Sequence, residues 1–214
     1  MFTKPHKNTN GTIGRGCEGC PFFGDGKGFV PDLINDSAPV FIYSQNPGES
    51  EEKGQRLTEW KFGQPVYEPC EPQPMTGKTG FAMQREYFPT AALTRDNVSL
   101  GNAIRCRLDH KDKLPTLDNV ELREAMEHCH RAHFRMPAAT KLIVAQGELG
   151  LHAMTQEGLE KGGSITNWRG WVLPFTPIDQ VRIHLSDVWT PYYSVDIPVL
   201  AVNHLAYIFR YPSA

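Results

Sequence analysis

The chain has 214 residues, 40% hydrophobic content and a formal net charge of −2, which is typical of a soluble protein with a sizeable core. The slight negative charge excludes a protein that coats nucleic acid non-specifically, because such proteins are usually basic, but it allows a local basic groove. No apolar run is long enough to span a bilayer, and residues 1–14 lack the apolar stretch of a signal peptide. We therefore expect one domain over residues 1–214, a cytoplasmic location, a monomer and no membrane partner.

Apolar runs that alternate with helix-permissive segments predict an α/β fold in three layers, with helices on both faces of a central, mostly parallel four-stranded sheet. A proline-rich segment at about 52–73 is expected to be an extended surface insertion. The expected elements in chain order are a strand at 39–44, helices at 49–60 and 81–92, a strand at 97–105, a helix at 116–135, a strand at 141–145, a helix at 150–161, β or irregular pieces at 169–174 and 181–193, and a strand at 198–202.

Polar residues lie near the carboxyl ends of four of these expected strands. Taken singly, each is an ordinary turn residue, or a histidine with a satisfied environment. In open parallel sheets, however, sites gather at the carboxyl ends of the strands, so we expect these residues to share one rim. The rim residues are Gln45 and Asn46, Asn102, the pair Gln146-Gly147, and His204.

Four of the five cysteines have a pattern suited to an inorganic centre. Cys17 and Cys20 form a C-x-x-C sequence followed by proline, and Cys106 and Cys129 lie far downstream, each between or beside basic residues. Two thiolates at i and i+3 bind one metal centre, and two more complete a four-sulfur shell. Zinc and an iron–sulfur cluster use the same ligands, so the spacing leaves both open. Cys70 is expected to be a surface thiol.

In their order along the chain, these motifs resemble those of the uracil-DNA glycosylase superfamily, and most closely its iron–sulfur branch, family 4. The resemblance runs over nearly the whole chain. The matching segments are Gly16–Pro21 for the opening cysteine motif, Ser44–Gly48 with Glu51 for G-E-A-P-G-x-x-E, Pro74–Gly80 for P-F-V-G-x-x-G, Asn102–Arg107 for N-V-x-K-C-R, Thr140–Gly147 for P-K-x-I-x-x-L-G, Arg169–Trp171 for an R-G-x turn, and His204–Arg210 for H-P-x-x-L-L-R.

The resemblance implies a monofunctional DNA glycosylase that hydrolyses the N-glycosidic bond of uracil, or of a related 5-substituted pyrimidine, flipped out of single- or double-stranded DNA. It implies a structural 4Fe–4S cluster on the four cysteines, with zinc as the alternative. Three arginines, Arg105, Arg107 and Arg210, are expected either to contact phosphates or to be plain surface charges.

The same resemblance implies roles for four of the rim residues. Asn102 would read the base edge, because one amide offers both a donor and an acceptor. His204 would donate to the oxygen of the departing base, and Asn46 would orient the attacking water. The implied site residues are Asn46, His204 and Gln45 for catalysis, and Asn102, Met75, Gly48 and Phe81 for binding the base.

Some residues depart from the family 4 pattern. Gln45 replaces a glutamate, Asn46 an alanine, Met75 a stacking phenylalanine and Leu205 a proline. The changes at Gln45, Met75 and Leu205 leave open an alternative: a catalytically weak or inactive iron–sulfur protein that binds DNA or a base within a replication or modification complex. In a third class, the protein is a structural partner in such a complex and the proline-rich insertion is its contact surface.

Overall fold

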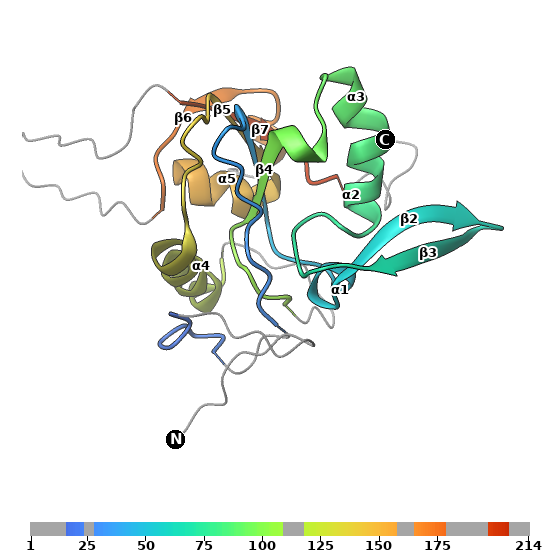
Figure 1. Cartoon of the computed structure of the whole chain (residues 1–214). Coiled ribbons are helices and arrows are strands. Elements are labelled where there is room, and N and C mark those ends of the chain that lie inside the picture. Colours follow the sequence, from blue (N-terminus) through green and yellow to red (C-terminus); the bar gives the residue numbers. More distant parts are fainter. Residues whose placement is uncertain (1–15, 24–27, 109–117, 158–164, 179–196, 206–214) are drawn as a thin grey trace, which may run out of the picture.

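The computed structural model describes residues 16–23, 28–108, 118–157, 165–178 and 197–205. In this part of the chain the centre is a five-stranded sheet in the order β4-β1-β5-β7-β6 (Figure 1). Strands β4, β1, β5 and β7 are parallel to their neighbours, and β6 runs antiparallel to β7 at the edge. The strand bounds are Val40–Ser44 for β1, Val98–Asn102 for β4, Leu142–Gln146 for β5, Val172–Pro174 for β6 and Pro198–Val202 for β7.

This architecture confirms the prediction of an α/β fold with a mostly parallel sheet, although the sheet has five strands rather than four. The fifth strand, β6, is only three residues long and lies within the segment 169–174, where the sequence predicted a β or irregular piece. A strand this short carries too few residues for an alternating pattern to identify it.

Helices cover both faces of the sheet. The side chains of β1 illustrate this, because successive residues of a strand point to opposite faces. Phe41 and Tyr43 belong to a core cluster with α4 and α5, whereas Ile42 packs on the other face with Met83 and Phe88 from the α2–α3 region. The structure therefore has three layers (Figure 1). The helical bounds are Glu49–Glu52 for α1, Lys78–Ala82 for α2, Met83–Tyr87 for the π-helical turn η1, Phe88–Thr90 for α3, Arg95–Asn97 for the 3-10 turn η2, Val120–His133 for α4, Gly147–Thr155 for α5 and Ile165–Trp168 for α6.

The segment 52–73 is not an extended insertion but a β-hairpin, formed by β2 (Gln55–Lys61) and β3 (Gln64–Pro69). The helix expected at 49–60 stops after one turn, because Gly54 adopts a left-handed φ of 61° and redirects the chain. The Cys70 N–H donates to the Gly54 carbonyl at 2.8 Å and closes the base of the hairpin. Figure 1 shows the hairpin projecting away from the sheet.

The other predicted boundaries moved by a few residues. The strand expected at 97–105 leaves the ladder after Asn102, but Ala103 N–H and Ile104 N–H still donate to the carbonyls of Ser44 and Gln45 at 2.9 and 3.0 Å. The piece expected at 181–193 lies outside the described residues. Among the described helices, none combines the length and apolar character needed to cross a bilayer.

Candidate active site and metal centre

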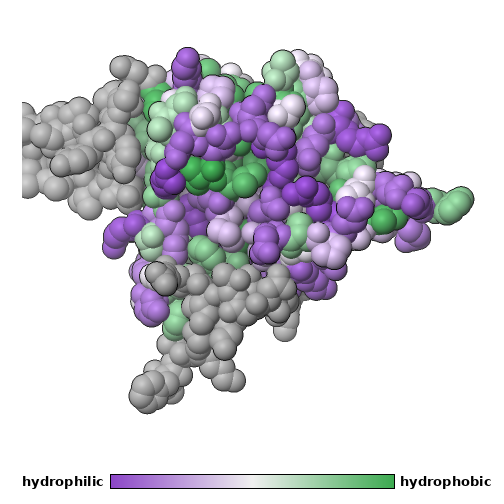
Figure 2. Space-filling view, in the orientation of Figure 1, coloured by the Kyte–Doolittle hydropathy of each residue, from purple (hydrophilic) through white to green (hydrophobic). Residues whose placement is uncertain are grey.

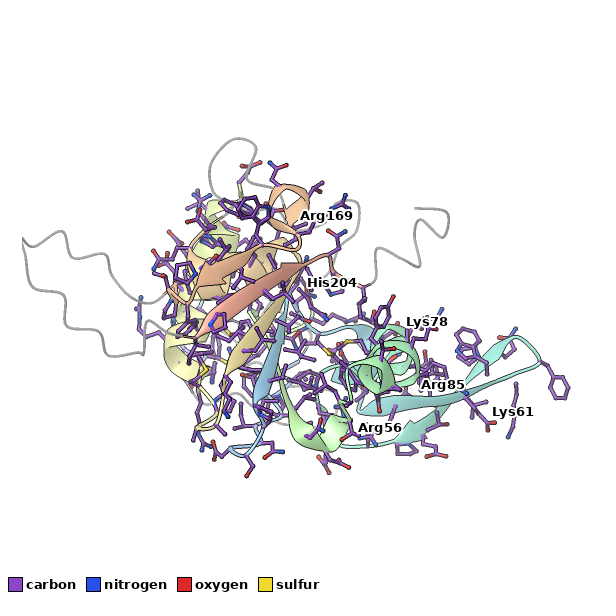
Figure 3. All side chains as sticks on the ribbon, turned by 90° about the horizontal axis from the view of Figure 1, so that it is seen from above. Arg56, Lys61, Lys78, Arg85, Arg169 and His204 are labelled. Carbon is purple, nitrogen blue, oxygen red and sulfur yellow. The ribbon has the colours of Figure 1, made fainter. Side chains whose placement is uncertain are left out.

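The predicted rim residues do meet at one edge of the sheet. Ser44 is paired with Asn102 in the ladder of β1 and β4, and the Ser44 hydroxyl donates to Gln146 Oε1 at 2.8 Å. Gln146 is paired with Val202 in the ladder of β5 and β7. His204 is half-buried and lies two residues beyond the end of β7 (Figure 3). The carboxyl ends of four neighbouring parallel strands thus bring polar side chains from distant parts of the chain to one edge.

Asn102 has the most informative environment of these residues. Its side chain is 2% exposed, and its backbone N–H donates to Asp32 Oδ1 at 3.3 Å. Its side-chain nitrogen is buried and has no hydrogen-bond partner among the described residues. An unsatisfied buried donor costs about 1–3 kcal/mol, so a ligand that supplies an acceptor here would recover that free energy.

Gln45 and Asn46 point to different surroundings. A Cβ on Gly147 would lie 2.1 Å from the Gln45 side-chain nitrogen, so the absence of a side chain at Gly147 makes room for the Gln45 amide at the start of α5. Gly147 also has a φ of 74°, which glycine adopts without strain. The Asn46 side chain is half-buried and donates to the Pro47 carbonyl at 3.0 Å. Asn46 therefore keeps its carbonyl oxygen available for a ligand or water, whereas Gln45 packs against the protein.

Glu51 joins the loop after β1 to the loop before α2. Its carboxylate accepts hydrogen bonds from the backbone N–H groups of Gly48, Met75 and Thr76. Burial raises the pKa of this carboxyl group, and the three N–H donors oppose the rise. The sequence motif includes Glu51 but does not indicate its role. In the structure, Glu51 fixes both loops that border the rim.

Met75 is held in place by its backbone and its side chain alike. Its φ is 59°, and the Arg95 guanidinium donates to the carbonyls of Met75 at 3.1 Å and Pro74 at 2.6 Å. A Cβ on Gly80 would lie 1.7 Å from the Met75 carbonyl oxygen, so helix α2 can approach this loop only with glycine there. The Met75 side chain is 5% exposed and packs with Ile42 and other apolar residues of the core.

The two predicted stacking residues therefore differ in what they can contact. Met75 is a core residue, while Phe81 on α2 is half-buried and lies under the Arg85 guanidinium, with 5.2 Å from Arg85 Cζ to the ring centroid. Phe81 presents an aromatic surface that a ligand can reach, and the neighbouring cation strengthens its interaction with an electron-rich partner.

The four predicted cysteine ligands line one cavity. Cys17 and Cys20 come from the loop at 16–23, Cys106 follows β4, and Cys129 lies on α4. The other residues that line the cavity are Phe29, Ile104, Arg105, Ala125, His128 and His133. Three of the thiols are at most 8% exposed. The structure therefore brings together sulfurs that are separated by up to 112 positions in the sequence.

The thiols lie close enough to affect one another's ionisation. The pKa of Cys17 is raised to about 12, chiefly by burial and to a lesser extent by the neighbouring Cys129 and Cys20. Burial also raises the pKa of Cys106, to which Cys129, Cys20 and Cys17 all contribute. Burial raises the pKa of Cys20 as well, so these three thiols stay protonated at neutral pH unless a cationic centre takes the place of the protons. Among the described residues, no group of three or more histidine, cysteine or acidic side chains is close enough to hold a single metal ion.

Histidines on α4 tie the cysteine loop to the helix. His128 Nε2 lies 2.8 Å from the Gly16 carbonyl oxygen, and His133 Nε2 lies 3.4 Å from Cys17 Sγ. Burial lowers the pKa of His133 to about 4, so this imidazole is neutral near pH 7. The sequence analysis missed His133; its spacing of four residues from Cys129 on one helix is the signal that predicts it on the same face.

A buried ion pair connects the cavity to Asn102. Arg105 is 1% exposed and its guanidinium pairs with Asp32, which is 6% exposed. The other guanidinium nitrogen donates to the Cys129 carbonyl at 3.3 Å and lies 3.6 Å from Cys129 Sγ. Because Asp32 also accepts the Asn102 N–H, a continuous chain of hydrogen bonds runs from the fourth cysteine to the rim.

Both alternatives expected for the arginines, a phosphate contact or a plain surface charge, are wrong for Arg105. A guanidinium that is buried and paired with Asp32 cannot reach a ligand on the surface. Arg107 is partly exposed, but its Nε lies 2.6 Å from Glu52 Oε2, so its charge is largely matched. Arg210 lies outside the described residues. The sequence could not separate these cases because Asp32 is 73 positions away from Arg105.

Comparison with known proteins adds no assignment. No protein-family model matches the sequence, and no curated protein matches it. Any functional conclusion therefore depends on the motifs and on the geometry described above.

Proposed function

We propose that this protein is a DNA glycosylase of the uracil-DNA glycosylase type, which hydrolyses the N-glycosidic bond of uracil or a 5-substituted pyrimidine flipped out of DNA. The observation that best supports it is the buried, unpartnered side-chain amide nitrogen of Asn102 at the edge where Asn46 and His204 also lie. Glycosylases must bring the base out of the stack, and a buried amide at a sheet edge is suited to reading that base.

Base recognition follows from the spacing of the strands. Asn102 ends β4 and His204 follows β7, and three strand spacings of about 4.8 Å separate them, or about 14 Å. Two side chains with a pyrimidine between them can fill that gap. The Asn102 amide offers a donor and an acceptor to adjacent base atoms, and Phe81 offers a stacking surface. Gly48 has no side chain to guard the 5-position of the pyrimidine, which supports a modified base as well as uracil.

The proposed chemistry is hydrolysis through a cation-like sugar. Breaking the glycosidic bond leaves positive charge on the sugar and negative charge on the base, as in glycoside hydrolysis. The His204 imidazole would donate an N–H to the base oxygen that gains charge, and one such donor is worth about 3–4 kcal/mol in other enzymes. Asn46 would orient the attacking water through its side-chain oxygen, since an amide is too weak a base to deprotonate it. Gln45, which packs against Gly147, would support the loop rather than act on the bond.

We further propose a 4Fe–4S cluster held by Cys17, Cys20, Cys106 and Cys129, with a structural role. Zinc would require four sulfurs about 2.3 Å from one point. The four thiols line one cavity, and zinc remains the alternative because it uses the same ligands. The resemblance of the cysteine motif to that of family 4 favours a cluster, which would fix the loop at 16–23 against α4 and the end of β4.

The second candidate is a DNA- or base-binding protein without turnover. The packing of Gln45 against the start of α5 favours it, because the residue that replaces the glutamate of family 4 is turned to the protein. Binding without cleavage would still use Asn102 and Phe81, so the two candidates share a site and differ only in chemistry.

The test is an abasic-site assay on a panel of single- and double-stranded oligonucleotides, each with one uracil or 5-modified pyrimidine. We expect strand cleavage after alkali for at least one base, and a loss of about 100-fold or more in Asn46→Ala and His204→Ala. Arg131→Ala on the exposed face of α4 is the control and should retain full activity. Base-specific binding without cleavage would support the second candidate; neither binding nor cleavage on any substrate would reject both.

A further inference from the structure

The turn of the β2–β3 hairpin carries a residue that folding does not explain. Phe62 is fully exposed and has a φ of 50°, followed by Gly63 at 76°. Two-residue hairpin turns of this kind need left-handed φ at both positions, which asparagine or glycine adopts with little strain. A phenylalanine there is strained and, at full exposure, recovers nothing by packing.

Other non-glycine residues with positive φ have contacts that hold them. Met75 is fixed through its N–H and carbonyl by Glu51 and Arg95. Gln156, the left-handed cap of α5, donates from its backbone to His152 and from its side chain to the Pro177 carbonyl, both at 2.8 Å. Phe62 differs because its side chain extends wholly into solvent. Its presence at the turn therefore indicates a contact made outside this chain.

The hairpin is attached to the same loop as the candidate active site. Leu57 in β2 is buried, and its N–H donates to the Thr76 carbonyl at 2.8 Å, while the Thr76 N–H donates to Glu51. The base of the hairpin is thus fixed to the rim, and the turn projects from it (Figure 1). Figure 2 shows hydrophobic surface at the outer end of this projection.

Cations accompany the exposed aromatic rings. Trp60 is 45% exposed, and Lys78 Nζ lies 5.5 Å from the centroid of its ring. Lys61 precedes Phe62 and pairs with Glu59 at 2.7 Å, an exposed pair that a competing phosphate can open at little cost. In the view of Figure 3, labelled cations are spread from Arg169 across α2 to the hairpin. Exposed aromatic rings next to cations are the surface that nucleic-acid bases stack on.

We propose that the hairpin tip, residues 60–63, is a second DNA contact, in which Phe62 stacks on or wedges beside a base several nucleotides away from the excised one. This proposal rests on the proposed function. Seven residues of β2 extend about 20 Å from the rim at about 3.3 Å per residue. At about 3.4 Å per nucleotide, the tip meets the DNA about six nucleotides from the flipped base. Phenylalanine inserted between base steps is a known way to grip and bend DNA.

The test compares DNA lengths in the intact protein. Phe62→Asn removes the ring and suits the left-handed turn, so the melting temperature should stay the same or rise. We expect about tenfold weaker binding to a 25-nucleotide DNA with a central target base, and unchanged binding to a five-nucleotide DNA with the same base. Tyr87→Asn, which removes an exposed aromatic ring outside the hairpin, should change neither affinity. The fluorescent base 2-aminopurine can be placed in turn at each position along the DNA. Its fluorescence should depend on Phe62 at about six nucleotides from the target base and not close to the target.

The outcomes separate this inference from the proposed function. Equal losses on both lengths, or none on either, would overturn the hairpin contact while base excision stands. If the wild-type protein binds neither DNA, both the hairpin contact and the glycosylase assignment fail.

Discussion

The clearest quantitative prediction concerns the buried pair of Asp32 and Arg105. Asp32→Asn keeps the oxygen that accepts the Asn102 N–H and removes only the negative charge that faces Arg105. The guanidinium is 1% exposed, so it cannot regain water without moving the end of β4. Removing one partner of a buried pair leaves an uncompensated charge and typically destabilises a protein by about 3–5 kcal/mol.

For a chain of this size, about 1 kcal/mol lowers the melting temperature by about 2–4 °C. The Asp32→Asn variant should therefore melt about 6–20 °C below the wild type, and the midpoint of urea unfolding should fall with little change in slope. Circular dichroism on the purified protein measures both. Glu59→Gln is the matched control, because its pair with Lys61 is 44% and 60% exposed and contributes about 1 kcal/mol or less. If the two variants melted within a degree of each other, the buried pair would not be the constraint inferred from the structure.

Two further predictions follow from the cysteine cavity and from α2. Cys129→Ser should remove the visible absorbance and bound iron of the purified protein, whereas Cys70→Ser, outside the cavity, should retain both; metal analysis that finds zinc in the wild type would reject the cluster. Gly80→Ala should destabilise the protein by about 1–3 kcal/mol in urea unfolding, since its Cβ would lie 1.7 Å from the Met75 carbonyl; stability equal to that of the wild type would show that α2 can shift freely.

The parallel core was predictable because its strands are short apolar runs that turn residues interrupt. The strand at 198–202 has the bounds that its sequence predicts, and Asn102 follows a segment with the same character. A strand that is buried on both faces is apolar along its whole length, so its composition alone predicts where it lies. Once these strands are located, the residues at their ends are located too, so the rim could be predicted as well.

The hairpin and the buried ion pair could not be predicted in the same way. Glu49 to Trp60 is permissive for helix, and only the left-handed turn at Gly54 and the contact between Leu57 and Thr76 decide for strands. Arg105 has the same local sequence whether it faces solvent or the core. Its burial depends on Asp32, and contacts over such separations are set by packing rather than by local pattern.

The position of that ion pair bears on why a sheet enzyme would keep a metal centre away from its rim. Cys106 lies four residues beyond Asn102, and Arg105 between them reaches both Cys129 and Asp32. A centre that holds the cysteines would therefore fix Arg105, and Arg105 in turn would fix the backbone amide of Asn102 through Asp32. A base-reading amide must be held to within a fraction of an ångström to discriminate between bases, and a rigid shell of supporting contacts provides that. On this reasoning the proposed inorganic centre would contribute by positioning the proposed base reader, and it would need no role in the proposed bond-breaking step.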